Sequence, residues 1–274
     1  MESQQTLRQA LSEVEQWEND QKDLWFWEKL GRLPFVFLDR ITPTFVHEKL
    51  GQAIDELSTY VDTGGRYLIN EKDILKRFTS PEQTRTGSRA VATEIPTLTE
   101  VSRMPLTQMN QVADNLRDAH KSFATVQGAT TGFGGIFTLV IDIPMLLGQS
   151  LKVLQEMALA YGYDPRDKQE RIFIIKCLQY SSADIVGKRS IIEELTTYQQ
   201  ASSKTQTVTQ LQGWREVIMT YRDNYGWKKL FQLVPVAGML FGAYLNRKTI
   251  EEVAEAGMML YRKRRILQRL AEGE

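Results

Sequence analysis

Residues 128–147 read GATTGFGGIFTLVIDIPMLL, an apolar run that begins with four glycines and carries an Asp and a Pro near its end. On a helix, Gly128 and Gly132 lie one turn apart and form a strip without side chains. A second apolar stretch, LFQLVPVAGMLFGAYL at 230–245, carries Gly238 and Gly242 at the same spacing. This G-x-x-x-G spacing lets two helix backbones approach closely. We predict that the two stretches are helices packed on each other or on a common neighbour at the centre of the protein.

Neither stretch is a good membrane span. A spanning helix needs about 20 predominantly apolar residues. The first stretch reaches that length only by including Asp142, and the second contains Pro235. An Asp at the bilayer centre costs about 3 kcal/mol on insertion scales. We therefore interpret both stretches as core helices, and a hairpin that dips into a membrane interface remains the alternative.

The first stretch is also not a nucleotide-binding loop. A phosphate-binding loop ends in Gly-Lys-Ser or Gly-Lys-Thr, whereas Gly132 is followed by Phe133 and the next Lys after it is Lys152. The dinucleotide fingerprint fails as well, because Gly132 and Gly134 as its first two glycines put Phe137 in the third position. Gly134 and Gly135 are therefore interpreted as helix-packing residues.

Helical periodicity dominates the chain, and no alternating strand pattern or fixed repeat interrupts it. We predict an all-α protein with a single domain over residues 1–274. The polar, proline-containing stretch at 79–104 is predicted to be a long surface loop.

Several residues predict where helices begin and end. Asp142, with Pro144 two residues later, is predicted to cap the helix that leads to Gly162, and Gly162 is predicted to be that helix's C-terminal cap. Asp164 is predicted to cap the following helix, with Pro165 in its first turn. Thr249 and Glu252 have capping-box spacing and predict the start of a final helix that ends near Leu270.

Composition excludes several classes of function. Lys plus Arg and Asp plus Glu both number 34, so net charge gives no reason to expect nucleic acid as a partner. The N-terminus lacks a secretory signal pattern, so we expect a cytoplasmic protein. The two histidines, His47 and His120, form no zinc motif, and no G-x-S-x-G elbow occurs. We predict no cofactor or metal. Cys177, the single cysteine, is predicted to lie in the core.

Asp142 is the remaining candidate catalyst. In apolar surroundings its pKa would be raised, which is one way to make a general acid. Helix capping is the favoured interpretation of the same residue. The basic run at 262–265 likewise allows two interpretations, contact with anionic lipid or favourable charge near a helix C-terminus.

The sequence resembles the EcsC family of bacterial proteins. The resemblance rests on Trp17-Glu18, the small-residue block at 128–135, Asp142-Ile143-Pro144 and the run Tyr161-Gly162-Tyr163-Asp164-Pro165, and it ends with Pro235, Gly238, Gly242 and Asn246. The family has no agreed activity, so the resemblance supplies no catalytic residues. It implies a helical fold and, through a family member encoded beside an ABC-type transporter, a role near the membrane or in secretion.

Together these features predict a non-enzymatic protein that is peripheral at the inner face of the cell membrane. It would bind the membrane face itself or a partner in membrane transport or secretion. Two alternatives stay open. One is a binding module for a lipid or other apolar small molecule. The other is a hydrolase or transferase that uses Asp142.

Overall fold

A computed structural model describes residues 2–21, 69–79, 94–132, 139–183, 188, 190–193, 195 and 235–273. For residues 131–132, 139–144 and 235–242 it describes the backbone only. The elements are α1 (Gln4–Asp20), α5 (Glu71–Leu75), the 3₁₀ helix η1 (Lys76–Phe78), α6 (Leu98–Arg103), α7 (Leu106–Gly132), α8 (Leu139–Ala160), α9 (Lys168–Ser182) and α12 (Pro235–Glu272). Every element in these ranges is helical, which confirms the all-α prediction.

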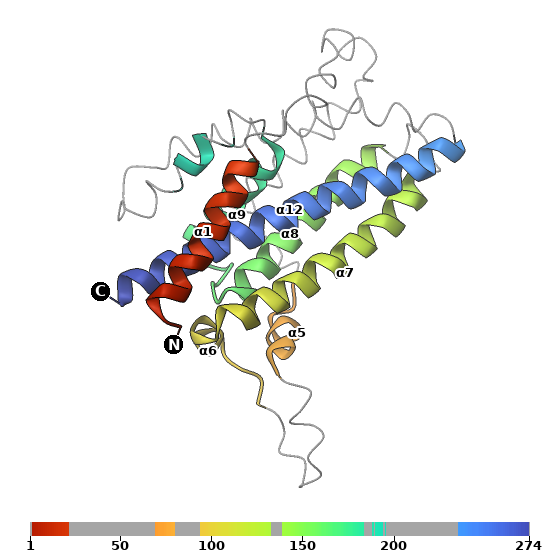
Figure 1. Cartoon of the computed structure of the whole chain (residues 1–274). Helices are drawn as coiled ribbons and strands as arrows, with labels where there is room; N and C mark the ends of the chain where they lie inside the picture. The colour runs from red at the N-terminus through yellow and green to blue at the C-terminus, as the bar shows by residue number, and fades with distance from the viewer. Residues whose placement is uncertain are drawn as a thin grey trace.

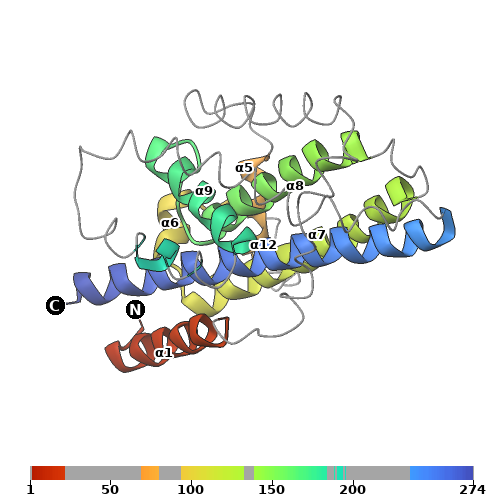
Figure 2. The same ribbon diagram turned by 90° about the horizontal axis from the view of Figure 1, so that it is seen from above.

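α12 is the central helix, and α7, α8, α9 and α1 all contact it. α7 and α12 lie side by side and run in opposite directions (Figures 1 and 2). α8 and α9 pack on α12 from another side, and α1 crosses its C-terminal half. None of the described helices is both long enough and apolar enough to cross a bilayer.

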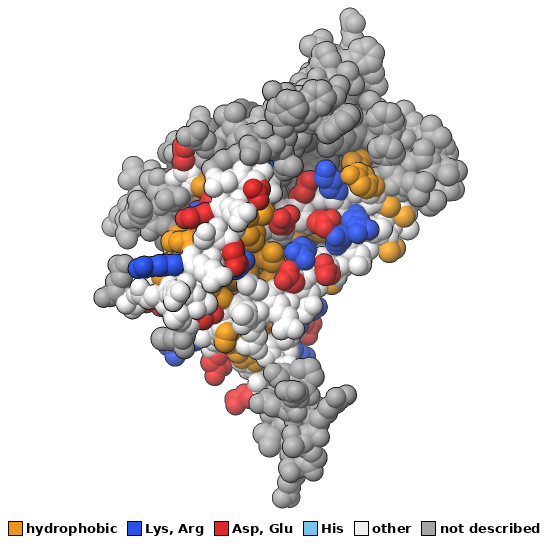
Figure 3. Space-filling model, viewed as in Figure 1, with side chains coloured by type: hydrophobic (Ala, Val, Ile, Leu, Met, Phe, Trp, Pro, Cys, Tyr) orange, Lys and Arg blue, Asp and Glu red, His pale blue; other side chains and the backbone are white. Residues whose placement is uncertain are grey.

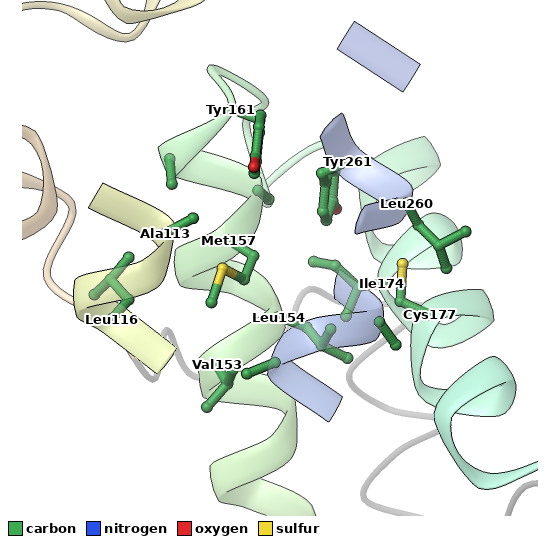
Figure 4. Close-up of a cluster of buried hydrophobic side chains, with 14 of the residues drawn as sticks. Ala113, Leu116, Val153, Leu154, Met157, Tyr161, Ile174, Cys177, Leu260 and Tyr261 are labelled. Carbon is green, nitrogen blue, oxygen red and sulfur yellow. The ribbon is translucent and has the colours of Figure 1, made fainter. Parts of the chain in front are cut away.

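The hydrophobic core lies where these helices meet (Figure 4). Met157 and Leu154 of α8 face Ile174 of α9 and Tyr261 of α12, and all four side chains are almost completely buried. Tyr261 also packs against Phe173, with 4.7 Å between the ring centroids. Burying such side chains is the main source of stability in a helical bundle, because each removes a large apolar area from water.

The close helix approach that the structure describes in atomic detail lies at Gly257 of α12. A Cβ atom added there would lie 2.6 Å from Cδ2 of Leu154 on α8. The absent side chain therefore lets α12 and α8 approach each other in the core. Gly257 has no sequence signal of such an approach, because no second glycine follows it at four-residue spacing.

The cap predictions around residue 162 are partly right. Gly162 follows the end of α8 with a φ of +75°, and Tyr163 N–H donates to the carbonyl of Ala158 (2.9 Å), which confirms the predicted C-terminal cap. The prediction for Asp164 and Pro165 is wrong, because α9 begins at Lys168 with Asp167 in the N-cap position.

Asp164 instead closes a turn. Its carboxylate accepts a hydrogen bond from Arg166 N–H at 2.9 Å. Burial alone would raise the pKa of Asp164, but the hydrogen bonds and charge of Arg166 lower it below its usual value. Short polar side chains commonly close such turns by bonding the backbone two residues on.

Three further boundaries differ from the predictions. α8 begins at Leu139, so Asp142 lies within its first turn rather than at its N-cap. α12 continues through Thr249, whose hydroxyl donates to the carbonyl of Leu245 (2.8 Å) inside the helix, so no capping box starts a helix there. The predicted loop at 79–104 contains α6, and its residues 80–93 lie outside the described residues.

Candidate functional site

Four large apolar side chains are strongly exposed among the described residues, and all four lie toward one end of the bundle. They are Phe123, Val126, Met145 and Tyr244, with 44 to 65% of each residue exposed. The last part of α7 and the first parts of α8 and α12 lie together at this end (Figures 1 and 2). Figure 3 shows hydrophobic side chains gathered there. We call these four residues the apolar end.

The periodicity of α7 explains why two of them face outward. Leu116 and Ala124 belong to the stripe of α7 that packs into the bundle, and both are buried. Phe123 and Val126 lie three residues apart on the opposite face of the same helix. The inner stripe fixes the orientation of α7, so these two side chains have no core position to occupy.

The glycine-bearing segments lead to the same end. Gly128 is buried in α7, and Gly132 is the last residue of that helix. Pro235, Gly238 and Gly242 lie in the first part of the antiparallel α12. Contact between the glycines of the two helices stays a prediction. Gly134 and Gly135 lie outside the described residues.

Charges next to the apolar end are largely paired. Lys121 of α7 forms an ion pair with Glu251 of α12. Lys248 lies 3.6 Å from Glu252, one turn along α12. Arg247 is exposed. The local excess of positive charge is therefore small, and apolar surface is the main feature that this end offers to a partner.

A histidine–glutamate pair joins α7 to α8 close to this end. His120 Nε2 lies 2.6 Å from Glu156 Oε2, and both side chains are mostly buried. Nearby hydroxyls donate to their own helices: Ser122 to the carbonyl of Asp118 and Ser150 to that of Leu146. A carboxylate can orient an imidazole for proton transfer, but such catalysis also needs a reacting group beside the other ring nitrogen.

The remaining candidate catalysts are placed as follows. Cys177 is completely buried in α9, and burial raises the pKa of its thiol well above its usual value, which confirms the prediction of a core residue. Only the backbone is described at Asp142 and Pro144, so a catalytic role for Asp142 stays a prediction. Asn246 is fully buried in α12.

The basic run at 262–265 is engaged inside the protein. Arg262 pairs with Glu13 and Lys263 with Glu18, both from α1. Arg264 pairs with Glu170 at 2.7 Å, and Arg265 donates two hydrogen bonds to the carbonyl of Tyr161. α12 ends at Glu272, so the run lies about two turns before the helix end, where the dipole has little effect. The helix-dipole interpretation therefore does not describe these contacts, and contact of the run with anionic lipid stays a prediction.

The apolar end was not predicted from the sequence. One signal was available: once Leu106, Met109, Val112, Leu116 and Ala124 are assigned to the inner stripe of α7, Phe123 and Val126 must face outward. Tyr244 gave no such signal, because it lies inside an apolar stretch that a core helix would also explain.

Comparison with known proteins covers most of the chain. The model of the EcsC protein family matches residues 8–266. The uncharacterised protein YdbA of Bacillus subtilis (strain 168) is 52% identical over 275 residues, which cover 100% of this chain and 97% of that protein. Protein EcsC of the same organism is 28% identical over 183 residues, 67% of this chain and 73% of that protein. No solved structure shows significant similarity. The chain belongs to the EcsC protein family.

Proposed function

We propose that this protein is a non-enzymatic helical protein that binds the inner face of the cell membrane through the apolar end. The observation that carries the proposal is that Phe123, Val126, Met145 and Tyr244, the strongly exposed large apolar residues of the described ranges, all come from the last part of α7 and the first parts of α8 and α12. Contiguous exposed apolar surface commonly marks a site of contact with protein or membrane.

A lipid interface suits these side chains. Phe and Tyr bury large areas, and Tyr keeps its hydroxyl in the polar headgroup region while its ring contacts acyl chains. The residues lie on the outer faces of their helices, so shallow contact would not require the core to open. Because Lys121 and Lys248 are paired with glutamates, binding should depend mainly on apolar burial and only weakly on lipid charge.

The proposal gives the His120–Glu156 pair a structural role. It ties α7 to α8, and the backbone carbonyl of His120 also accepts a hydrogen bond from Gln149 (3.4 Å). These contacts hold the helices that carry the apolar end in a fixed relation, as a preformed binding surface requires.

Vesicle flotation tests the proposal. The purified protein should float with vesicles of phosphatidylcholine alone and nearly as well when phosphatidylglycerol is added. The double variant Phe123→Glu/Val126→Glu should lose about 2 kcal/mol of binding free energy, because each removed side chain contributes about 1 kcal/mol when half buried. This corresponds to a partition coefficient about 30-fold lower.

A matched control has the same added charge at the other end of the same helix. Thr107 and Gln111 are exposed in the first two turns of α7, so Thr107→Glu/Gln111→Glu should float like the wild type. Equal losses in both variants would show a general charge effect and contradict the proposal. A wild-type protein that never floats would also contradict it and would point to a membrane protein as the occupant of the apolar end.

A further inference from the structure

α1 covers the C-terminal half of α12. It lies on the side of α12 that faces the viewer in Figure 1, and its Trp17 ring also packs against Tyr180 of α9, with 5.6 Å between the ring centroids. Its apolar contacts with the bundle are limited: Leu7 and Val14 are buried, and Ala10, Leu11 and Trp17 are partly buried. Trp17 Nε1–H donates to Glu255 of α12 at 2.8 Å.

The ion pairs between the N-terminal segment and α12 join acidic side chains of the segment to basic side chains of α12. Glu13 Oε2 lies 2.5 Å from Arg262, and both carboxylate oxygens of Glu18 lie 2.8 Å from Lys263 Nζ. Glu2, just before α1, pairs with Arg269. Three carboxylates of the N-terminal segment therefore sit on three cations of α12.

α12 carries a dense positive charge where α1 packs on it. Its residues 262–269 read RKRRILQR, five cations in eight residues. Arg264 and Arg265 are bound by Glu170 and by the carbonyl of Tyr161, so they hold the fold without α1. For Arg262 and Lys263 the ion-pair partners recorded among the described residues come from α1. We call Arg262 and Lys263 the basic strip.

We propose that α1 is an autoinhibitory cover that competes with anionic membrane lipid for the basic strip of α12. Each Lys or Arg near the surface of an anionic leaflet contributes about 1 kcal/mol of binding free energy. In the conformation described here the strip is occupied by Glu13 and Glu18, which stand where lipid phosphates would bind. The inference rests on the proposed function, because the membrane is the partner in both.

The two partners of each ion pair respond oppositely to an anionic surface. Arg262 and Lys263 are attracted to it, whereas Glu13 and Glu18 are repelled, so its approach weakens both pairs from both sides. The carboxylate of Glu13 is exposed, so its pair with Arg262 contributes little stability and is screened by salt, whereas the Glu18–Lys263 pair is largely buried and is the stronger link of α1. Leu7 and Val14 keep the cover closed in the absence of such a surface.

Release of the basic strip from α1 adds a second membrane contact to the one at the apolar end. Tyr244 and Arg262 are 18 residues apart on one continuous helix, which is about 27 Å at 1.5 Å per residue. Contacts at both ends of this length would lay α12 along the membrane. A second contact on a rigid linker raises overall affinity without any change at the first.

Flotation of charge-neutralised full-length protein tests the cover. Glu13→Gln/Glu18→Gln should raise the partition coefficient on vesicles with 30% phosphatidylglycerol at least fivefold, because each cation near an anionic surface contributes about fivefold. Binding to pure phosphatidylcholine should not change. Leu7→Ala, which loosens α1 without altering charge, should shift anionic binding in the same direction. Circular dichroism would verify that the variants remain folded.

The control removes the same charge from the same helix without touching the basic strip. Glu15 and Asp20 are exposed on α1, so Glu15→Gln/Asp20→Asn should change binding to anionic vesicles less than twofold. An equal gain in anionic binding by this control would show that net charge alone causes the effect, and it would overturn the inference. If the wild type floats through the apolar end but Glu13→Gln/Glu18→Gln gains nothing, the inference fails and the proposed function stands. If only the variants float, and only on anionic vesicles, the cover is supported and the apolar end fails as the membrane contact.

Discussion

Replacing Gly162 with Ala should lower the free energy of unfolding by about 3 kcal/mol, measured by urea denaturation. Gly162 has a φ of +75°, where an L side chain costs about 1 to 2 kcal/mol. An added Cβ would also lie 2.5 Å from Cα of Ser102 in α6, a backbone atom that cannot rotate away. Relieving that overlap requires α6 and the α8–α9 turn to separate, at about 1 to 3 kcal/mol.

Gly148→Ala is the matched control for this substitution. Gly148 lies within α8, and an added Cβ there would meet nothing within 4 Å. Because Ala is a better helix former, this variant should be unchanged or more stable by up to about 1 kcal/mol. If both variants lose similar stability, the cost does not come from the turn at Gly162 and our description of that turn is incorrect.

Replacing Glu170 with Ala should cost about 3 kcal/mol of stability at neutral pH. Glu170 is buried, and its carboxylate lies 2.7 Å from Arg264 and accepts a hydrogen bond from the hydroxyl of Tyr261 at 3.3 Å. Burial raises the pKa of Glu170, and the charge of Arg264 opposes that rise. Removing the carboxylate leaves a largely buried guanidinium without its counter-ion, and this kind of loss typically costs 3 to 5 kcal/mol.

Two further variants separate the ion pair from general damage. The exposed pair Asp73–Lys76 should contribute little, so Asp73→Ala should cost less than about 0.5 kcal/mol. Replacing both partners, as Glu170→Leu/Arg264→Met, should recover part of the loss seen with Glu170→Ala, because no charge is then left unpaired. A loss below about 1 kcal/mol for Glu170→Ala would contradict the assigned role of the pair.

Local sequence signals predicted the structure correctly where a residue type fits only one structural role. Gly162 was predicted to be a cap because few residues other than glycine tolerate the left-handed backbone after a helix. Cys177 was predicted to be buried because it lies in a run of apolar residues with helical spacing. The all-α class followed from the same periodicity, which extends over most of the chain.

Sequence motifs that fit more than one position in a helix led to wrong predictions of helix boundaries. Thr249 and Glu252 have capping-box spacing, but the same pair fits inside a helix when the Thr hydroxyl bonds back to Leu245. A true capping box was overlooked at Thr97 and Glu100, which starts α6 within the predicted loop. The three-residue spacing of Thr and Glu alone cannot distinguish these cases, because the burial that decides between them comes from other parts of the chain.

Contacts between residues far apart in the chain could not be predicted from the sequence. Nothing local to Arg262 or Lys263 indicates Glu13 and Glu18, which lie about 250 and 245 residues away. The exposure of Tyr244 depends in the same way on how α12 is rotated, and contacts along its full length set that rotation. The position of the candidate site therefore depends on how the helices pack together. Most of the residues that the sequence pointed to are structural residues instead.

The most direct test of membrane contact at the apolar end is an environment-sensitive fluorophore attached at position 126. Because Cys177 is buried and its thiol pKa is raised, Val126→Cys would carry the label selectively, and Gln111→Cys provides the control on the same helix. Adding vesicles should shift the emission of the label at 126 to shorter wavelength, as in an apolar interface, and leave the label at 111 unchanged. An unchanged emission at 126 under conditions where the protein floats would show that another surface meets the membrane and would contradict this account.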